Sequence, residues 1–170
     1  MNHDWITELI IHCDDTKNGR TTTPRELDLW HAERICKKEL TGRKEETLLA
    51  FNPHLPYVGY HSLIQPSGQV HPLRGENELG SHCAGHNGKA LGVVLAGRDS
   101  YTLLAWTSLK EYVLDVCRRY SNVSVHGHRE FNSGKTCPGF DVKAWLENEM
   151  KPLEGHILHA PSNEGAPNAL

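Results

Sequence analysis

Residues 90–96, ALGVVLA, are the most apolar run of the chain and constrain its fold more than any other segment. A short, continuous apolar run is typical of a strand that is buried on both faces. Such a strand lies inside a sheet that is covered by other elements, so we expect helices on this one. Further segments rich in β-branched residues predict strands at residues 5–13, 58–64 and 123–125.

Two segments carry the start signal of a helix. Residues 23–26, TPRE, combine a capping box with proline at the first helical position, which predicts a helix from residue 24 to about Leu40. Thr102 is expected to cap a second helix that runs to about Tyr120. The side chains expected on the inner faces are Leu27, Trp30, His31 and Ile35 in the first helix and Leu109, Tyr112, Val113, Val116, Cys117 and Tyr120 in the second.

A turn and a last helix complete the predicted elements. Residues 66–68, PSG, are expected to turn the strand at 58–64 back on itself as a hairpin. A final helix is expected from about Asp141 to Met150. The class is therefore α/β, a single domain with a central mixed β-sheet flanked by helices. The residues expected to face inward from the last helix are Ala144, Trp145 and Leu146.

The length of 170 residues fits one domain. We expect that domain to span residues 1–151 and a mobile tail, rich in proline and glycine, to span residues 152–170. Residues 41–56 are expected to form an inserted surface loop. Residues 74–90, rich in glycine, histidine and asparagine, are expected to form a long loop over the functional site.

Composition excludes several classes of partner and location. The net charge is −3 and no Lys/Arg block occurs, which argues against nucleic acid. No apolar segment reaches membrane-spanning length, and the N-terminus lacks the regions of a signal peptide. Five irregularly spaced cysteines give no disulfide framework and fit a reducing compartment. We expect a soluble monomer that is cytoplasmic when made.

A candidate metal site can be assembled from three residues. His128 and Cys137 lie in a loop punctuated by glycine, proline and serine, and His12 ends the first predicted strand. Imidazole and thiolate bind Zn²⁺, and three protein ligands with an open fourth position are typical of a catalytic zinc. Cys13 should face the core instead, because neighbours on a strand point to opposite faces. Residue types alone also allow two core histidines and a buried thiol.

Six ordered blocks of sequence carry a resemblance to a known family. The chain resembles the zinc-dependent N-acetylmuramoyl-L-alanine amidases of the type 2 class, whose fold is shared with the peptidoglycan recognition proteins. Within that class it is most similar to the amidase-type lysozymes, or endolysins, of the T-odd coliphages. The matching blocks are residues 10–13 (IIHC), 25–31 (RELDLWH), 58–61 (VGYH), 80–87 (GSHCAGHN), 90–93 (ALGV), and 127–130 with 135–141 (GHRE and KTCPGFD).

The resemblance implies an activity and a role for individual residues. It implies one Zn²⁺ per chain, held by His12, His128 and Cys137. The implied reaction cleaves the amide bond between N-acetylmuramic acid and L-alanine in peptidoglycan by a zinc-activated water. Tyr60 and Lys135 match the family's catalytic tyrosine and lysine. A phage relationship further implies action on the bacterial wall after release from the host cytoplasm.

Other polar residues near these blocks are candidates for supporting roles. His61, His82 and Asn87 are expected to line the cleft and contact the substrate, with His61 the weakest of the three because it alternates with Tyr60. Glu130 could accept the second imidazole N–H of a zinc ligand, or act as a surface carboxylate or cap. His31 could buttress the site from the first helix, or simply pack beside Trp30.

Two alternative functions stay open on the sequence. One is a non-catalytic peptidoglycan-binding receptor of the same fold, whose members typically lack the cysteine ligand. The other is a cytoplasmic cell-wall recycling amidase, which commonly has aspartate as its third ligand and glutamate in place of the tyrosine. The presence of Cys137 and Tyr60 favours the lytic phage type over both.

Overall fold

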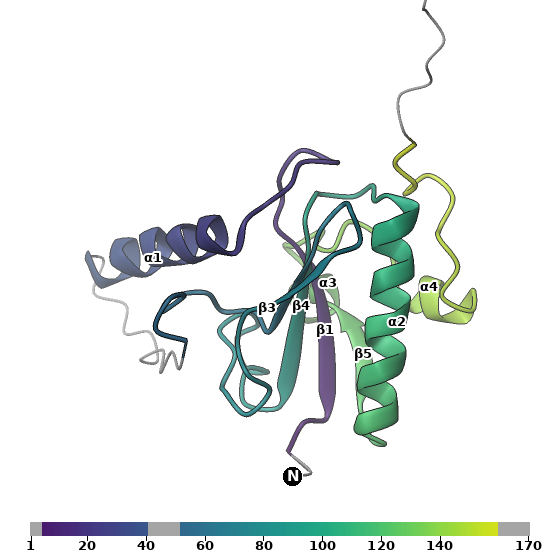
Figure 1. Ribbon diagram of the computed structural model, residues 1–170. Coiled ribbons are helices and arrows are strands. Elements are labelled where there is room, and N and C mark those ends of the chain that lie inside the picture. Colours follow the sequence, from purple (N-terminus) through teal and green to yellow (C-terminus); the bar gives the residue numbers. More distant parts are fainter. Residues whose placement is uncertain (1–4, 41–51, 160–170) are drawn as a thin grey trace, which may run out of the picture.

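The computed structural model describes the backbone of residues 5–40 and 52–159, with the side chains of these ranges except at residues 35–40. In this part of the chain the strands are β1 (Glu8–Cys13), β2 (Ser62–Ile64), β3 (Val70–Pro72), β4 (Ala90–Leu95) and β5 (Ser124–Gly127). They form one sheet in the order β3-β2-β4-β1-β5, with β4 at its centre (Figure 1). The β2–β3 hairpin is antiparallel and the other pairs are parallel, so the sheet is mixed, as predicted.

The helices of the described residues are α1 (Pro24–Leu40), α2 (Leu103–Arg119), α3 (His128–Phe131) and α4 (Val142–Glu147). The predicted start of α1 is confirmed, because the Glu26 backbone N–H donates to Thr23 Oγ1 at 3.2 Å and the Thr23 N–H donates to Glu26 Oε2 at 2.8 Å. Thr102 caps α2 by accepting the backbone N–H of Ala105 at 3.1 Å. Local sequence therefore determines where both long helices begin.

Successive side chains of β1 point to opposite faces of the sheet. Leu9 and Ile11 belong to the main hydrophobic cluster, which includes Trp106 of α2. Ile10 belongs to a separate cluster, so it points to the other face. Figure 1 shows α2 running along the sheet while α1 projects away from it. The core therefore lies between the sheet and α2, and His12, two residues after Ile10, lies on the opposite face.

Some predicted details differ from the structure. β2 begins at Ser62, so Tyr60 precedes the strand instead of lying within it. Ala144 is exposed, because α4 is only six residues long and directs Val142 and Trp145 to the core. Trp30 is 36% exposed, and its ring lies 5.7 Å from the guanidinium carbon of Arg20 instead of joining the inner face of α1.

The start of the expected tail is part of the folded domain. The backbone carbonyl of His156 accepts hydrogen bonds from the Tyr101 N–H at 2.9 Å and the Trp106 Nε1–H at 3.2 Å. The Leu158 N–H donates to the Tyr101 carbonyl at 2.8 Å. The rest of the expected tail, 160–170, and most of the expected inserted loop, 41–51, lie outside the described residues. None of the helices described here is long and apolar enough to cross a membrane.

Candidate metal and catalytic site

The topology brings the three predicted ligands to one edge of the sheet. β1 and β5 are parallel neighbours, and Ile11 pairs with Gly127. His12 of β1 and His128, the first residue of α3, directly follow this pair. Their ring centroids are 4.5 Å apart. One ligand atom from each of His12, His128 and Cys137 lies within 4.8 Å of the other two. This cluster could hold a metal ion.

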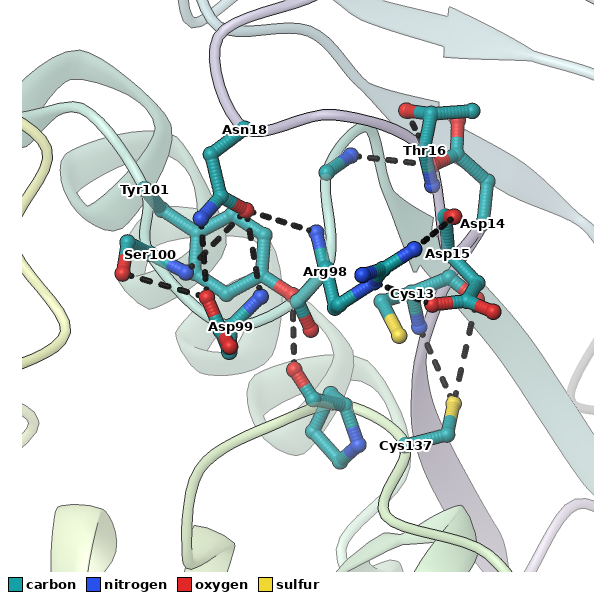
Figure 2. A network of polar contacts seen from close by, with 12 residues as sticks. Cys13, Asp14, Asp15, Thr16, Asn18, Arg98, Asp99, Ser100, Tyr101 and Cys137 are labelled. Carbon is teal, nitrogen blue, oxygen red and sulfur yellow. Dashed lines mark hydrogen bonds and ion pairs between the residues drawn. The ribbon is translucent and has the colours of Figure 1, made fainter.

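Cys137 is held against the end of β1 by the backbone. The Cys13 N–H donates to Cys137 Sγ at 3.0 Å, and the Arg129 N–H donates to the Cys137 carbonyl at 2.8 Å. Figure 2 shows the sulfur of Cys137 directed at the backbone of Cys13. The side chain of Cys13 packs against the main hydrophobic cluster, as predicted, so of the two cysteines only Cys137 joins the ligand cluster.

A polar network fixes the loop after Cys137. The buried Tyr101 hydroxyl donates to the Pro138 carbonyl at 2.6 Å, and Asn18 bridges the neighbouring turn by donating to Asp99 Oδ1 at 2.8 Å (Figure 2). Gly139 has φ +91°, and a Cβ there would lie 2.2 Å from the backbone oxygen of Arg98. Only glycine allows this close approach at that φ, so the loop packs tightly and Cys137 is positioned.

The donor set fits zinc. Burial, followed by the neighbouring histidines His82 and His128, holds the pKa of His12 well below its ordinary value. Burial and then the positive charge of Lys135 lower the pKa of His128. Both rings are therefore neutral and keep a lone pair for a metal. Two neutral imidazoles and one cysteine sulfur match the nitrogen and sulfur ligands that Zn²⁺ prefers.

Tyr60 and Lys135 both lie beside the cluster. The Tyr60 ring centroid is 5.0 Å from that of His12, and burial raises the pKa of its phenol, so the hydroxyl keeps its hydrogen. Lys135 is exposed in the loop before Cys137, and its charge acts on His128. The structure thus places a neutral O–H donor and an exposed cation next to the candidate metal centre.

His31 and Asp28 of α1 hold the segment that precedes β2. His31 Nδ1 accepts the backbone N–H of Gly59 at 2.7 Å, and its ring centroid lies 5.1 Å from that of Tyr60. Asp28, fully buried, accepts the backbone N–H groups of Tyr57 at 2.7 Å and Val58 at 3.0 Å. Sequence reasoning missed Asp28, although an acid three residues before a histidine on the inner face of α1 was a usable signal.

The side chains of His61 and Asn87 form hydrogen bonds with the backbone. His61 is 1% exposed, and its two ring nitrogens bond the Glu78 carbonyl at 3.0 Å and the Gly92 N–H at 2.9 Å. Asn87 Oδ1 accepts the backbone N–H groups of His82 at 2.9 Å and of Cys83 at 2.8 Å. Both side chains therefore hold the loop between β3 and β4, and their contact with substrate stays a prediction.

Glu130 has the capping role that was one of its two expected roles, and His82 contacts a neighbouring histidine. Glu130 Oε1 accepts the Gly127 N–H at 2.6 Å and Oε2 lies 2.9 Å from His126 Nδ1, so this carboxylate caps α3 and pairs with His126 rather than His128. His82 Nδ1 lies 3.0 Å from His12 Nε2, and burial lowers the pKa of His82 to about 3. His82 is therefore buried against the candidate metal ligand His12.

The buried His61 predicts a dependence of stability on pH. Burial lowers its pKa from 6.5 in the unfolded chain to about 4 in the folded protein. Between pH 7 and pH 5 the unfolded state therefore binds more protons, and this group alone should lower the free energy of unfolding by about 2 kcal/mol. In His61→Gln the loss on acidification should be smaller by that amount. Urea unfolding of zinc-free protein at both pH values measures it, and equal losses in both proteins would contradict the assignment.

Comparison with known proteins identifies a family by sequence. The family model described as N-acetylmuramoyl-L-alanine amidase matches residues 3–140. The endolysin of Escherichia phage T7 is 30% identical over 151 residues, covering 84% of this chain and 87% of the phage protein. The endolysin of Klebsiella phage KP32 is 28% identical over 153 residues, covering 85% of this chain and 88% of that protein.

Solved structures confirm the expected fold. The N-acetylmuramoyl-L-alanine amidase LysC from Clostridium intestinale URNW superposes with a TM-score of 0.65 at 22% identity, covering 86% of this chain and 87% of LysC. Drosophila peptidoglycan recognition protein SD gives a TM-score of 0.60 at 16% identity, covering 84% and 79% of the two chains. Together with the sequence matches, the strand order and the clustered ligands, they show that this chain belongs to the N-acetylmuramoyl-L-alanine amidase family.

Proposed function

We propose that this chain is an endolysin-type peptidoglycan hydrolase that cleaves the amide bond between N-acetylmuramic acid and L-alanine. The family membership supports the bond, and the cluster of His12, His128 and Cys137 supports hydrolysis over binding alone. A receptor needs no such cluster, whereas an amidase that uses a metal does. The phage relatives bear the name endolysin, which supports action on the bacterial wall.

We further propose that the cluster holds one Zn²⁺ per chain. The three side chains would supply two nitrogen ligands and one sulfur ligand, and three protein ligands are typical of a catalytic zinc. A Zn²⁺ held by these residues would supply Lewis-acid chemistry and would acidify a water at the site.

The side chains of this protein have distinct tasks in the proposed reaction. Attack on a neutral amide places negative charge on the carbonyl oxygen, and the ammonium of Lys135 stabilises that charge. The Tyr60 hydroxyl donates a hydrogen bond to the reacting carbonyl and so orients it. His31 and Asp28 keep Tyr60 in place by bonding the backbone of residues 57–59. The C–N bond then breaks, and the leaving amine of L-alanine takes up the proton that the attacking water gave up.

The test of this function is metal-dependent solubilisation of the wall. Purified Gram-negative peptidoglycan that carries a covalent dye should release soluble dye when the protein is added. Treatment of the protein with a chelator should abolish release, and added Zn²⁺ should restore it. A chelated protein that still pellets with the wall but releases nothing shows that binding survives without the metal. Release that is insensitive to chelation would contradict the metal site.

A further inference from the structure

The contact between His82 and His12 belongs to a directed chain of hydrogen bonds. His12 Nε2 lies 3.0 Å from His82 Nδ1, and His82 Nε2 lies 3.4 Å from the backbone carbonyl of Ala90. A carbonyl oxygen only accepts, so a neutral His82 ring must carry its hydrogen on Nε2. Its Nδ1 is then a lone pair, and the single hydrogen between the two rings must belong to Nε2 of His12.

The fold makes a specific place for the ring of His82. A Cβ on Gly92, in the middle of β4, would lie 2.6 Å from His82 Cδ2, and a Cβ on Gly80 would lie 2.5 Å from the same atom. His82 is only 9% exposed, so any larger residue at either position would displace its buried ring. Asn87 fixes the backbone of His82 from the other side. Two glycines and one asparagine thus hold this ring against His12.

We propose that His82 is a positioning residue that fixes the tautomer and the ring orientation of His12, leaving Nδ1 of His12 as the atom that faces the metal. This inference rests on the proposed metal site. A metal-binding histidine needs one ring nitrogen free of hydrogen, and the partner of the other nitrogen decides which one that is. In this chain that partner is a second histidine, which the carbonyl of Ala90 in turn orients.

Two substitutions of His82 separate the hydrogen bond from the packing. His82→Phe keeps a ring but removes the acceptor, and Zn²⁺ affinity should fall by about 10- to 100-fold, the range found when such partners are lost. His82→Asn places an amide oxygen close to the position of Nδ1, so its affinity should stay closer to that of the wild type. Competition with a chromophoric chelator measures both, and circular dichroism of the zinc-free proteins checks that each is folded.

Gly92, which lies against the His82 ring, offers a second test variant with a matched control. Gly92→Ala should displace the ring of His82 and weaken Zn²⁺ binding in the same direction as His82→Phe. Gly88→Ala, in the turn just before β4, has nothing within 4 Å of the added Cβ and should bind Zn²⁺ like the wild type. If Gly92→Ala and Gly88→Ala bound Zn²⁺ with equal affinity, the position of the His82 ring would not matter for metal binding, and the proposal would be contradicted.

The decisive readout is the tautomer of His12 in zinc-free protein. The ¹⁵N chemical shifts of its ring should show hydrogen on Nε2 alone in the wild type and a mixture of both tautomers in His82→Phe. The same single tautomer in both proteins, or loss of affinity in His82→Asn equal to that in His82→Phe, would overturn the proposal. This readout needs neither zinc nor peptidoglycan, so its failure is distinguishable from failure of the proposed function.

Discussion

Replacing Cys137 with serine is expected to remove zinc and hydrolysis together. Serine retains the size of the side chain, but its neutral hydroxyl is a far weaker zinc ligand than a thiolate. Only His12 and His128 would remain, and two imidazoles do not complete a zinc site. Metal analysis after dialysis should find less than one tenth of the zinc of the wild type, and release of dye from peptidoglycan should fall to background.

The control for this substitution is another half-buried cysteine. Cys117 lies on α2 and packs against the main hydrophobic cluster, away from the ligand cluster. Cys117→Ser should therefore keep one zinc per chain and its activity, even if its free energy of unfolding decreases. A Cys137→Ser protein that is fully active after removal of metal would remove the cluster from the mechanism.

Replacing Lys135 with alanine should separate catalysis from zinc binding. The ammonium is exposed and is not a ligand, so the zinc content should stay at one per chain. Loss of its charge beside the reacting carbonyl should lower kcat by about 100- to 1,000-fold, the usual effect of removing one oxyanion donor. Turnover on a soluble muramyl peptide, measured with zinc content on the same samples, tests both expectations.

Lys143 of α4 provides the matched control for this charge. It is exposed and on a different element, so Lys143→Ala changes the net charge equally without touching the cluster. Its kcat should equal that of the wild type. An unchanged kcat in Lys135→Ala would exclude the lysine from the reaction, whereas loss of zinc in that variant would mean that Lys135 supports the loop of Cys137 instead.

The candidate ligands could be predicted because each is marked by local sequence. His12 ends an apolar β-branched run, and parallel strands bring their carboxyl ends to one edge of a sheet. Thr23 and Thr102 likewise mark the helix starts by bonds to residues three positions away. Sequence patterns that span a few residues, together with the resemblance of the ordered blocks to a known family, were enough to predict the fold and the ligand cluster.

The polar residues around the cluster could not be assigned in the same way. The partners of His61 lie 17 and 31 residues away, and the partner of His82 lies 70 residues away. Only the folded structure shows that His61 bonds to backbone groups and that His82 bonds to the candidate metal ligand His12. The capping role of Glu130 is easier to predict, because Glu130 lies three residues after Gly127, which is the spacing of a capping box. A carboxylate that bonds the Gly127 N–H in this way is less available to bond His128.

The most direct test of the central claim is to identify the bond that is cut. Purified Gram-negative peptidoglycan is digested with the zinc-loaded protein, and the released fragments are analysed by mass spectrometry. The account predicts free stem peptides with a new L-alanine amino terminus, absent when a chelator is present and restored by Zn²⁺. Glycan fragments, or peptides cut at their cross-links with the lactyl amide intact, would contradict it.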